Sequence, residues 1–96
     1  MWTGYPAYSI SKAAVNVLTG LLAKSFAPKV RVNSISPGLI IKAEDMHPDK
    51  WNKLVEKLPM KKQGKAYHIN EGINFLIQNE YITGQTIVID GGYQLV

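Results

Sequence analysis

Tyr5-Pro6-Ala7-Tyr8-Ser9-Ile10-Ser11-Lys12, near the start of this 96-residue chain, predicts the first turns of a helix. Tyr8 and Lys12 are four residues apart, a spacing that places both side chains on one helical face with Cβ atoms about 5–6 Å apart. A phenol has a pKa of about 10, and a nearby ammonium lowers it. Tyr8 can then exchange a proton with an oxygen that changes between carbonyl and alcohol, or with a ring nitrogen. The pair alone is more often found on an ordinary helix, with the tyrosine half-buried and the lysine solvated.

The composition is that of a small globular domain, with 46% hydrophobic and 19% charged residues. Cysteine is absent, so disulfides and thiolate metal sites are excluded, and we expect a cytoplasmic protein. No apolar run is long enough to span a membrane, and neither His47 nor His68 has metal-ligand spacing around it. The net charge of +4 comes mainly from lysine, and Arg31 is the only arginine. We therefore expect no membrane, metal or nucleic-acid partner.

The periodicity predicts three helices and two strands. The helices are expected over residues 7–26, 49–58 and 67–78, and the strands over 29–36 and 85–90. Val15 and Leu22 widen the apolar face of the first helix, which suggests burial on two sides, against a sheet and against another helix or subunit. A helix followed by a strand is typical of α/β proteins.

Ligands of open α/β sheets bind beyond the carboxyl ends of the strands, where Pro37-Gly38-Leu39-Ile40 is expected to lie. An ordinary strand-ending turn is the alternative reading of this segment. A polar stretch and a short helix follow it, and we expect residues 38–60 to form a substrate lid. Met46 and Trp51 either line the inner side of this lid or pin it to the core, which is the commoner role for such residues.

Three motifs occur in order: Tyr8-x-x-x-Lys12, then Arg31-Val32-Asn33-Ser34-Ile35-Ser36-Pro37-Gly38, then Tyr81-Ile82-Thr83-Gly84 with Val88-Ile89-Asp90-Gly91-Gly92. Together they resemble the carboxy-terminal part of short-chain dehydrogenases/reductases. The lid and the ending look most like those of pteridine reductases. The resemblance implies an α/β fold, the carboxy-terminal part of a Rossmann-type doubly wound parallel sheet, with residues 1–96 forming a single partial domain.

The resemblance also implies an NADPH-dependent reductase that acts on a small molecule, a pteridine or a related carbonyl or imine. Tyr8 would donate the proton, and Lys12 would lower the pKa of Tyr8 and hydrogen-bond the nicotinamide ribose. The nicotinamide carboxamide would be held by the backbone of Pro37, Gly38, Leu39 and Ile40. The substrate pocket would be walled by Leu39, Met46 and Trp51. Lys42 stands about where many relatives carry a threonine that touches the cofactor phosphate, so that contact differs here.

The family's glycine-rich cofactor turn, which lies between a strand and a helix, has no counterpart in these residues. We therefore expect the chain to be the last third of a reductase: a truncated chain, a gene fragment or one piece of a split chain. Alone it should be inactive, and either unstable or associated with its partner, which would be another copy or the missing amino-terminal portion. Two alternatives remain, a non-catalytic association module and a 3-oxoacyl or enoyl reductase of fatty-acid synthesis.

Overall fold

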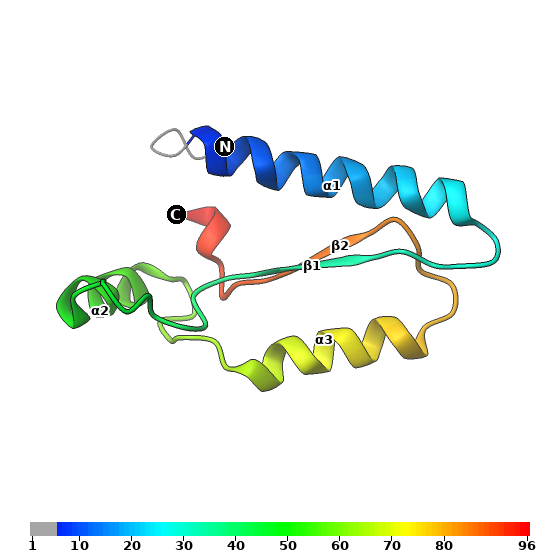
Figure 1. The fold of residues 1–96 in the computed structure, drawn as a ribbon. Coiled ribbons are helices and arrows are strands. Elements are labelled where there is room, and N and C mark those ends of the chain that lie inside the picture. Colours follow the sequence, from blue (N-terminus) through cyan, green and yellow to red (C-terminus); the bar gives the residue numbers. More distant parts are fainter. Residues whose placement is uncertain (1–5) are drawn as a thin grey trace. The chain divides into compact units, whose positions relative to one another are not determined.

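The computed structural model describes the backbone of residues 6–96 and the side chains from Ile10 onward. The elements follow in the order α1 (Pro6–Phe26), β1 (Ser34–Pro37), α2 (Pro48–Lys57), α3 (Ala66–Gln78), β2 (Thr86–Ile89) and the short 3₁₀ helix η1 (Tyr93–Leu95) (Figure 1). Strands β1 and β2 pair in a two-stranded sheet. The N–H of Ser34 donates to Gln85 O and the N–H of Gly38 donates to Ile89 O. Because both bonds advance in the same direction, the strands are parallel, which confirms the predicted α/β fold of two strands and three helices.

The first strand begins later than the sequence predicts, at Ser34 rather than Lys29. The N–H of Val32 donates to Thr83 Oγ1 at 3.1 Å, and Val32 O accepts from the N–H of Gly84 at 2.7 Å. Val32 is therefore bonded to a turn, partly through a side chain, and the N–H of Val30 donates to Phe26 O at 3.1 Å, so neither residue enters the strand ladder. The prediction of a strand from Lys29 was wrong at its start for this reason.

The carboxy-terminal residues after β2 form the 3₁₀ helix η1. Asp90 organises it, because Oδ1 accepts from the N–H of Gly92 at 2.9 Å and Oδ2 accepts from the N–H of Gln94 at 3.0 Å. Gly92 has a φ of 93°, which a residue with a Cβ rarely adopts. The carboxylate and this glycine together turn the chain immediately after β2.

The chain divides into two compact units, and each is described by itself. The first comprises the residues up to Ser34 together with Leu76–Ile87, and the second comprises Ile35–Phe75 with Val88–Val96. None of the helices within residues 6–96 combines the length and the apolarity that a membrane span requires.

In the first unit, α1 packs through small and polar residues. Thr19 and Ala23 are buried, and Asn16 Oδ1 accepts a hydrogen bond from Thr86 Oγ1 at 3.2 Å. Leu22 is half-buried. The other large apolar side chains that the structure describes on this helix are more than half exposed, namely Ile10, Val15, Val17, Leu18, Leu21 and Phe26. The predicted burial on two sides is thus not reached within the residues that the structure describes.

The end of α3 is held in the first unit by Arg31. Its Nη1 donates to Leu76 O at 2.7 Å and its Nη2 donates to Ile77 O at 3.1 Å. These carbonyls belong to the last turn of α3, where no helical N–H follows to satisfy them. A cation there also matches the negative end of the helix dipole, so Arg31 acts as a cap supplied from a distant part of the chain.

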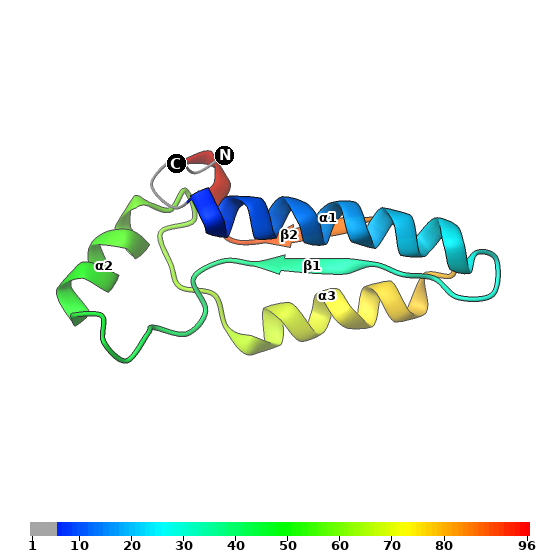
Figure 2. The ribbon, with the colours of Figure 1, turned by 45° about the horizontal axis from the view of Figure 1, so that its top comes forward.

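In the second unit, α3 lies close to the two strands at Gly72. A Cβ added there would lie 3.2 Å from Ile35 Cδ1 and would collide with Ile89 Cδ1. The loop that follows β1 runs into α2 (Figure 2). Helix α2 contributes Trp51 to the core of this unit, and Leu58, the residue after the helix, is also buried. The helix predicted over residues 49–58 is therefore present, one residue earlier at each end.

Candidate active site

Helix α1 carries the backbone of both residues of the predicted catalytic pair, Tyr8 and Lys12. The side chain of Tyr8 lies outside the residues whose side chains the structure describes. Lys12 is half-buried and takes part in an interaction. The continuous helix supplies the four-residue spacing that the prediction needs, and the roles of the two side chains stay predictions.

The Pro37-Gly38 segment ends β1, as the sequence predicts, and its glycine has a packing reason. A Cβ on Gly38 would lie 2.6 Å from Asp90 Cα and 2.7 Å from Asp90 Cβ. The N–H of Gly38 donates to Ile89 O at 3.1 Å. Glycine therefore lets the backbone after β1 approach the end of β2 closely, at the carboxyl edge where ligands of parallel sheets bind.

Both carbonyls that follow Gly38 are bonded to one short segment of the chain. Leu39 O accepts from the N–H of Gly64 at 2.9 Å, and Ile40 O accepts from Gln63 Nε2 at 2.6 Å. Leu39 and Ile40 are both half-buried. The segment expected to hold the nicotinamide is therefore fixed in place by residues 63–64.

Trp51 is linked to this segment through the same glutamine. Its side chain is buried, with 8% exposed, and its indole Nε1–H donates to Gln63 Oε1 at 3.1 Å. The sequence leaves two roles open for Trp51, lining the inner side of the predicted lid or pinning it to the core. This arrangement favours the pinning role. The structure thus joins Trp51 with Ile40, but through a residue that was not predicted.

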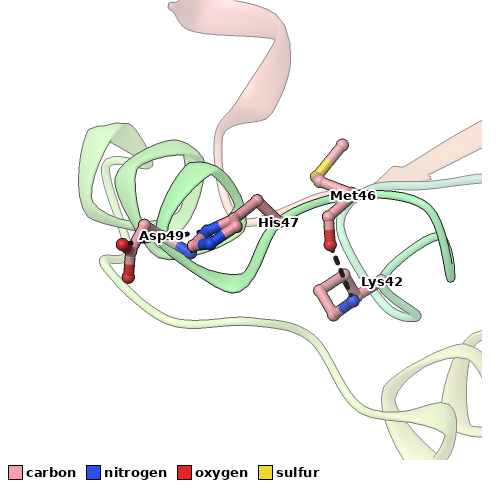
Figure 3. A network of polar contacts seen from close by, with 4 residues as sticks. All are labelled: Lys42, Met46, His47 and Asp49. Carbon is pink, nitrogen blue, oxygen red and sulfur yellow. Dashed lines mark hydrogen bonds and ion pairs between the residues drawn. The ribbon is translucent and has the colours of Figure 1, made fainter.

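The loop that contains Met46 is organised by Lys42. The ammonium Nζ donates to Met46 O at 2.9 Å (Figure 3). It also donates to Ala43 O at 3.2 Å, and the N–H of Met46 donates to the same oxygen at 3.0 Å. Met46 itself is half-buried. The Lys42 ammonium thus holds residues 42–46 in a tight loop.

The two histidines act at helix starts. His47 is the residue before α2, and its Nδ1 accepts from the N–H of Asp49 at 3.1 Å (Figure 3). His68 lies in the first turn of α3, and its Nδ1 accepts from the N–H of Lys65 at 2.9 Å. Each satisfies an N–H that a helix start would otherwise leave unpaired. Over the part of the chain that the structure describes, no cluster of three or more acidic or histidine side chains could hold a metal ion.

Gln63 is the residue at this site that sequence reasoning missed. It stands in a lysine-rich connection, where a polar residue carries no periodic or motif signal. Its two partners are 12 and 23 residues away in the sequence, so only the fold brings them together.

Comparison with known proteins identifies the family of the chain. A sequence profile described as "Enoyl-(Acyl carrier protein) reductase" matches residues 1–94. A glucose 1-dehydrogenase of Gluconobacter oxydans is 37% identical over 98 residues, covering 95% of this chain and 37% of the relative. A dihydromonapterin reductase of Klebsiella pneumoniae is 35% identical over 89 residues, covering 93% of this chain and 37% of the relative.

A solved structure is similar over the same part. FolM alternative dihydrofolate reductase 1 from Brucella suis, in complex with NADP, superposes with a TM-score of 0.86 and 35% identity, covering 93% of this chain and 36% of that one. The chain thus spans little more than a third of the length of these relatives. The chain belongs to the short-chain dehydrogenase/reductase family of NAD(P)-dependent oxidoreductases, of which it represents the carboxy-terminal portion.

Proposed function

We propose that the chain is the catalytic carboxy-terminal portion of an NADPH-dependent reductase of a pteridine or a related carbonyl or imine. The similarity to a dihydromonapterin reductase and to the NADP complex of FolM, each over 93% of this chain, is the observation that carries the proposal. The position of Tyr8 and Lys12 on one continuous helix supports it.

The nicotinamide cofactor, when bound, supplies the hydride. Tyr8 supplies the proton, and Lys12 makes the phenol more acidic and binds the nicotinamide ribose. The backbone of residues 37–40 holds the carboxamide. Leu39 and Met46 line the substrate pocket under a lid formed by residues 38–60, and Trp51 pins the helix of this lid to the core. The segment fits this role, because each carbonyl oxygen has two lone pairs and the bonds from Gln63 and Gly64 use one on each of two carbonyls.

The test is turnover of the full-length product of the gene that encodes these residues. With NADPH and a dihydropterin, we expect Tyr8→Phe to lower kcat by a factor of roughly 100 or more, as the loss of a general acid does. Tyr81→Phe is the matched control, because Tyr81 is fully exposed and lies far from Tyr8 in the sequence. A Tyr8→Phe variant that turns over like the control would remove Tyr8 from the role of proton donor.

A second substrate class is favoured by particular matches. The family profile carries the description of an enoyl reductase, and a human 3-oxoacyl-[acyl-carrier-protein] reductase is 35% identical over 96 residues. The same full-length protein should therefore be assayed with a 3-oxoacyl thioester and an enoyl thioester beside the dihydropterin. A kcat/KM that is higher for a thioester would replace the pteridine proposal and keep the reductase.

The exposed apolar face of α1 supports association with another copy or with an amino-terminal cofactor half. A gene that encodes no strand and glycine-rich turn ahead of these residues would favour the alternative of a non-catalytic association module.

A further inference from the structure

We infer that Gln63 is a positioning residue of the reductase, which couples the lid helix α2 to the backbone that receives the nicotinamide. This inference rests on the proposed function. Gln63 lies outside the three motifs on which the family resemblance depends. The basis of the inference is that its side chain bonds two partners, one a hydrogen-bond donor and the other an acceptor.

The two hydrogen bonds of Gln63 fix the orientation of its amide. Trp51 Nε1–H can only donate, so it must face the amide oxygen, which it does at 3.1 Å. Ile40 O can only accept, so it must face the amide nitrogen, which it does at 2.6 Å. Gln63 thus bonds a donor with its amide oxygen and an acceptor with its amide nitrogen. The amide cannot be rotated by 180° without breaking both bonds.

The surroundings of the bridge make these bonds effective. Trp51 is buried and Gln63 is half-buried, so water competes weakly for their polar groups. The next residue reinforces the contact, because the N–H of Gly64 donates to Leu39 O at 2.9 Å. A Cβ on Gly64 would collide with Ile40 Cδ1, so the segments 63–64 and 39–40 are in close contact.

The bridge through Gln63 couples the position of α2 to that of the backbone at Ile40. Any tilt of α2 moves the indole of Trp51, and through Gln63 it moves the carbonyl of Ile40. The position of the lid and the position of the nicotinamide segment are therefore set together. Small displacements of reacting groups cost much of the rate, so a loss of this bridge should appear in cofactor binding and in turnover.

The experiment uses the full-length gene product, two variants of Gln63 and one control variant, together with Trp51→Phe alone and combined with Gln63→Met. Gln63→Met keeps the length of the side chain and removes both bonds. Gln63→Glu keeps an oxygen for the indole of Trp51 but places a second oxygen against Ile40 O. Gln78→Met is the matched control, because Gln78 is exposed at the end of α3. The readouts are the NMR signal of the Trp51 indole N–H, assigned by its absence in Trp51→Phe, and the Kd of NADPH and kcat.

We expect Gln63→Met to shift the indole signal towards that of a solvated indole, because its bond to Gln63 is lost. We also expect the Kd of NADPH to rise by about two- to tenfold, the effect of the lost bond to Ile40 O, which is the one that fixes the nicotinamide segment. Gln63→Glu should restore the indole signal while the Kd stays raised. Adding Trp51→Phe to Gln63→Met should cost less than the two single effects combined, because both act on one bridge.

Two results would overturn the inference. In the first, the unchanged protein is active, and Gln63→Met has the same Kd of NADPH and the same kcat as Gln78→Met. Gln63 is then structural only, and the reductase proposal stands. If the unchanged protein neither binds nor oxidises NADPH although its indole signal depends on Gln63, the proposed function fails and the positioning role fails with it. The indole signal, which needs no cofactor, separates these two cases.

Discussion

The substitution Gly38→Ala tests the close approach between the ends of β1 and β2. The added Cβ would lie 2.6 Å from Asp90 Cα and 3.0 Å from Asp90 O. Carbon atoms normally approach to about 3.5–4.0 Å, so the new contact is short by about 1 Å. Two of the three atoms it meets belong to the backbone of Asp90, so no rotamer change relieves it. The two strand ends must therefore separate.

The cost has two parts. Overpacking of this kind typically destabilises by about 1–3 kcal/mol. Separation of the strands also weakens the bond from the N–H of Gly38 to Ile89 O, now 3.1 Å long. A net loss of about 1 kcal/mol is usual for such a bond. We therefore expect Gly38→Ala to lower the free energy of unfolding by roughly 2–4 kcal/mol.

Gly20→Ala is the matched control. Gly20 lies inside α1, and a Cβ added there meets no atom within 4 Å. The same chemical change should therefore stabilise the protein by about 0.5–1 kcal/mol, through helix propensity alone. Urea unfolding of the full-length gene product, followed by circular dichroism, measures both variants, and equal m-values are required for the comparison. A Gly38→Ala variant as stable as the unchanged protein would refute the steric reasoning.

Three further predictions concern charge, capping and association. Lys12→Met should move the alkaline limb of the pH–rate profile for reduction to higher pH, because the Tyr8 phenol loses the cation that favours its ionised form. Lys24→Met is the control on the same helix, and an unchanged profile for Lys12→Met would show that Lys12 does not lower the pKa of Tyr8. Arg31→Met should lower the free energy of unfolding by about 1–3 kcal/mol and speed amide exchange in the last turn of α3, since the bonds at 2.7 and 3.1 Å are lost. Leu21→Asn should weaken association, measured by analytical ultracentrifugation, because Leu21 is 59% exposed in the apolar face of α1.

The helices could be predicted almost to the residue because their signals are local. Pro28 follows the end of α1 at Phe26, and the apolar spacing of α3 ends at Gln78 as predicted. Strand β1 could not be placed as well. Val32 has the composition of a strand residue, but its N–H is bonded to the hydroxyl of Thr83, 51 residues later. The start of a strand depends on its partner, and a single sequence does not show which residue that partner presents.

The candidate site also contains residues that the sequence reveals and one that it does not. The Tyr8–Lys12 spacing and the Pro37-Gly38 turn are visible in the sequence because each is a short motif with a fixed geometry. Gln63 is not visible, because its importance comes from Trp51 and Ile40, which reach it from two other segments. Motifs thus identify the groups that would touch cofactor and substrate, whereas the contacts that hold those groups in place appear only in the structure.

Helix α1 carries both the proposed catalytic residue Lys12 and the exposed apolar face. Lys12, Asn16, Thr19 and Ala23 follow one another at intervals of four, three and four residues, so they share a face, and this face is the one that packs. Val17, Leu18 and Leu21 lie on the remaining surface of the helix, and each is more than half exposed. A helix that packs through its polar face while its apolar face stays open is poorly fixed by the described residues alone, since most helical stability comes from burial of an apolar face. Whatever covers that face should also fix the orientation of Lys12. We therefore expect substitutions such as Leu21→Asn to lower turnover together with association, although they change no group that touches the substrate.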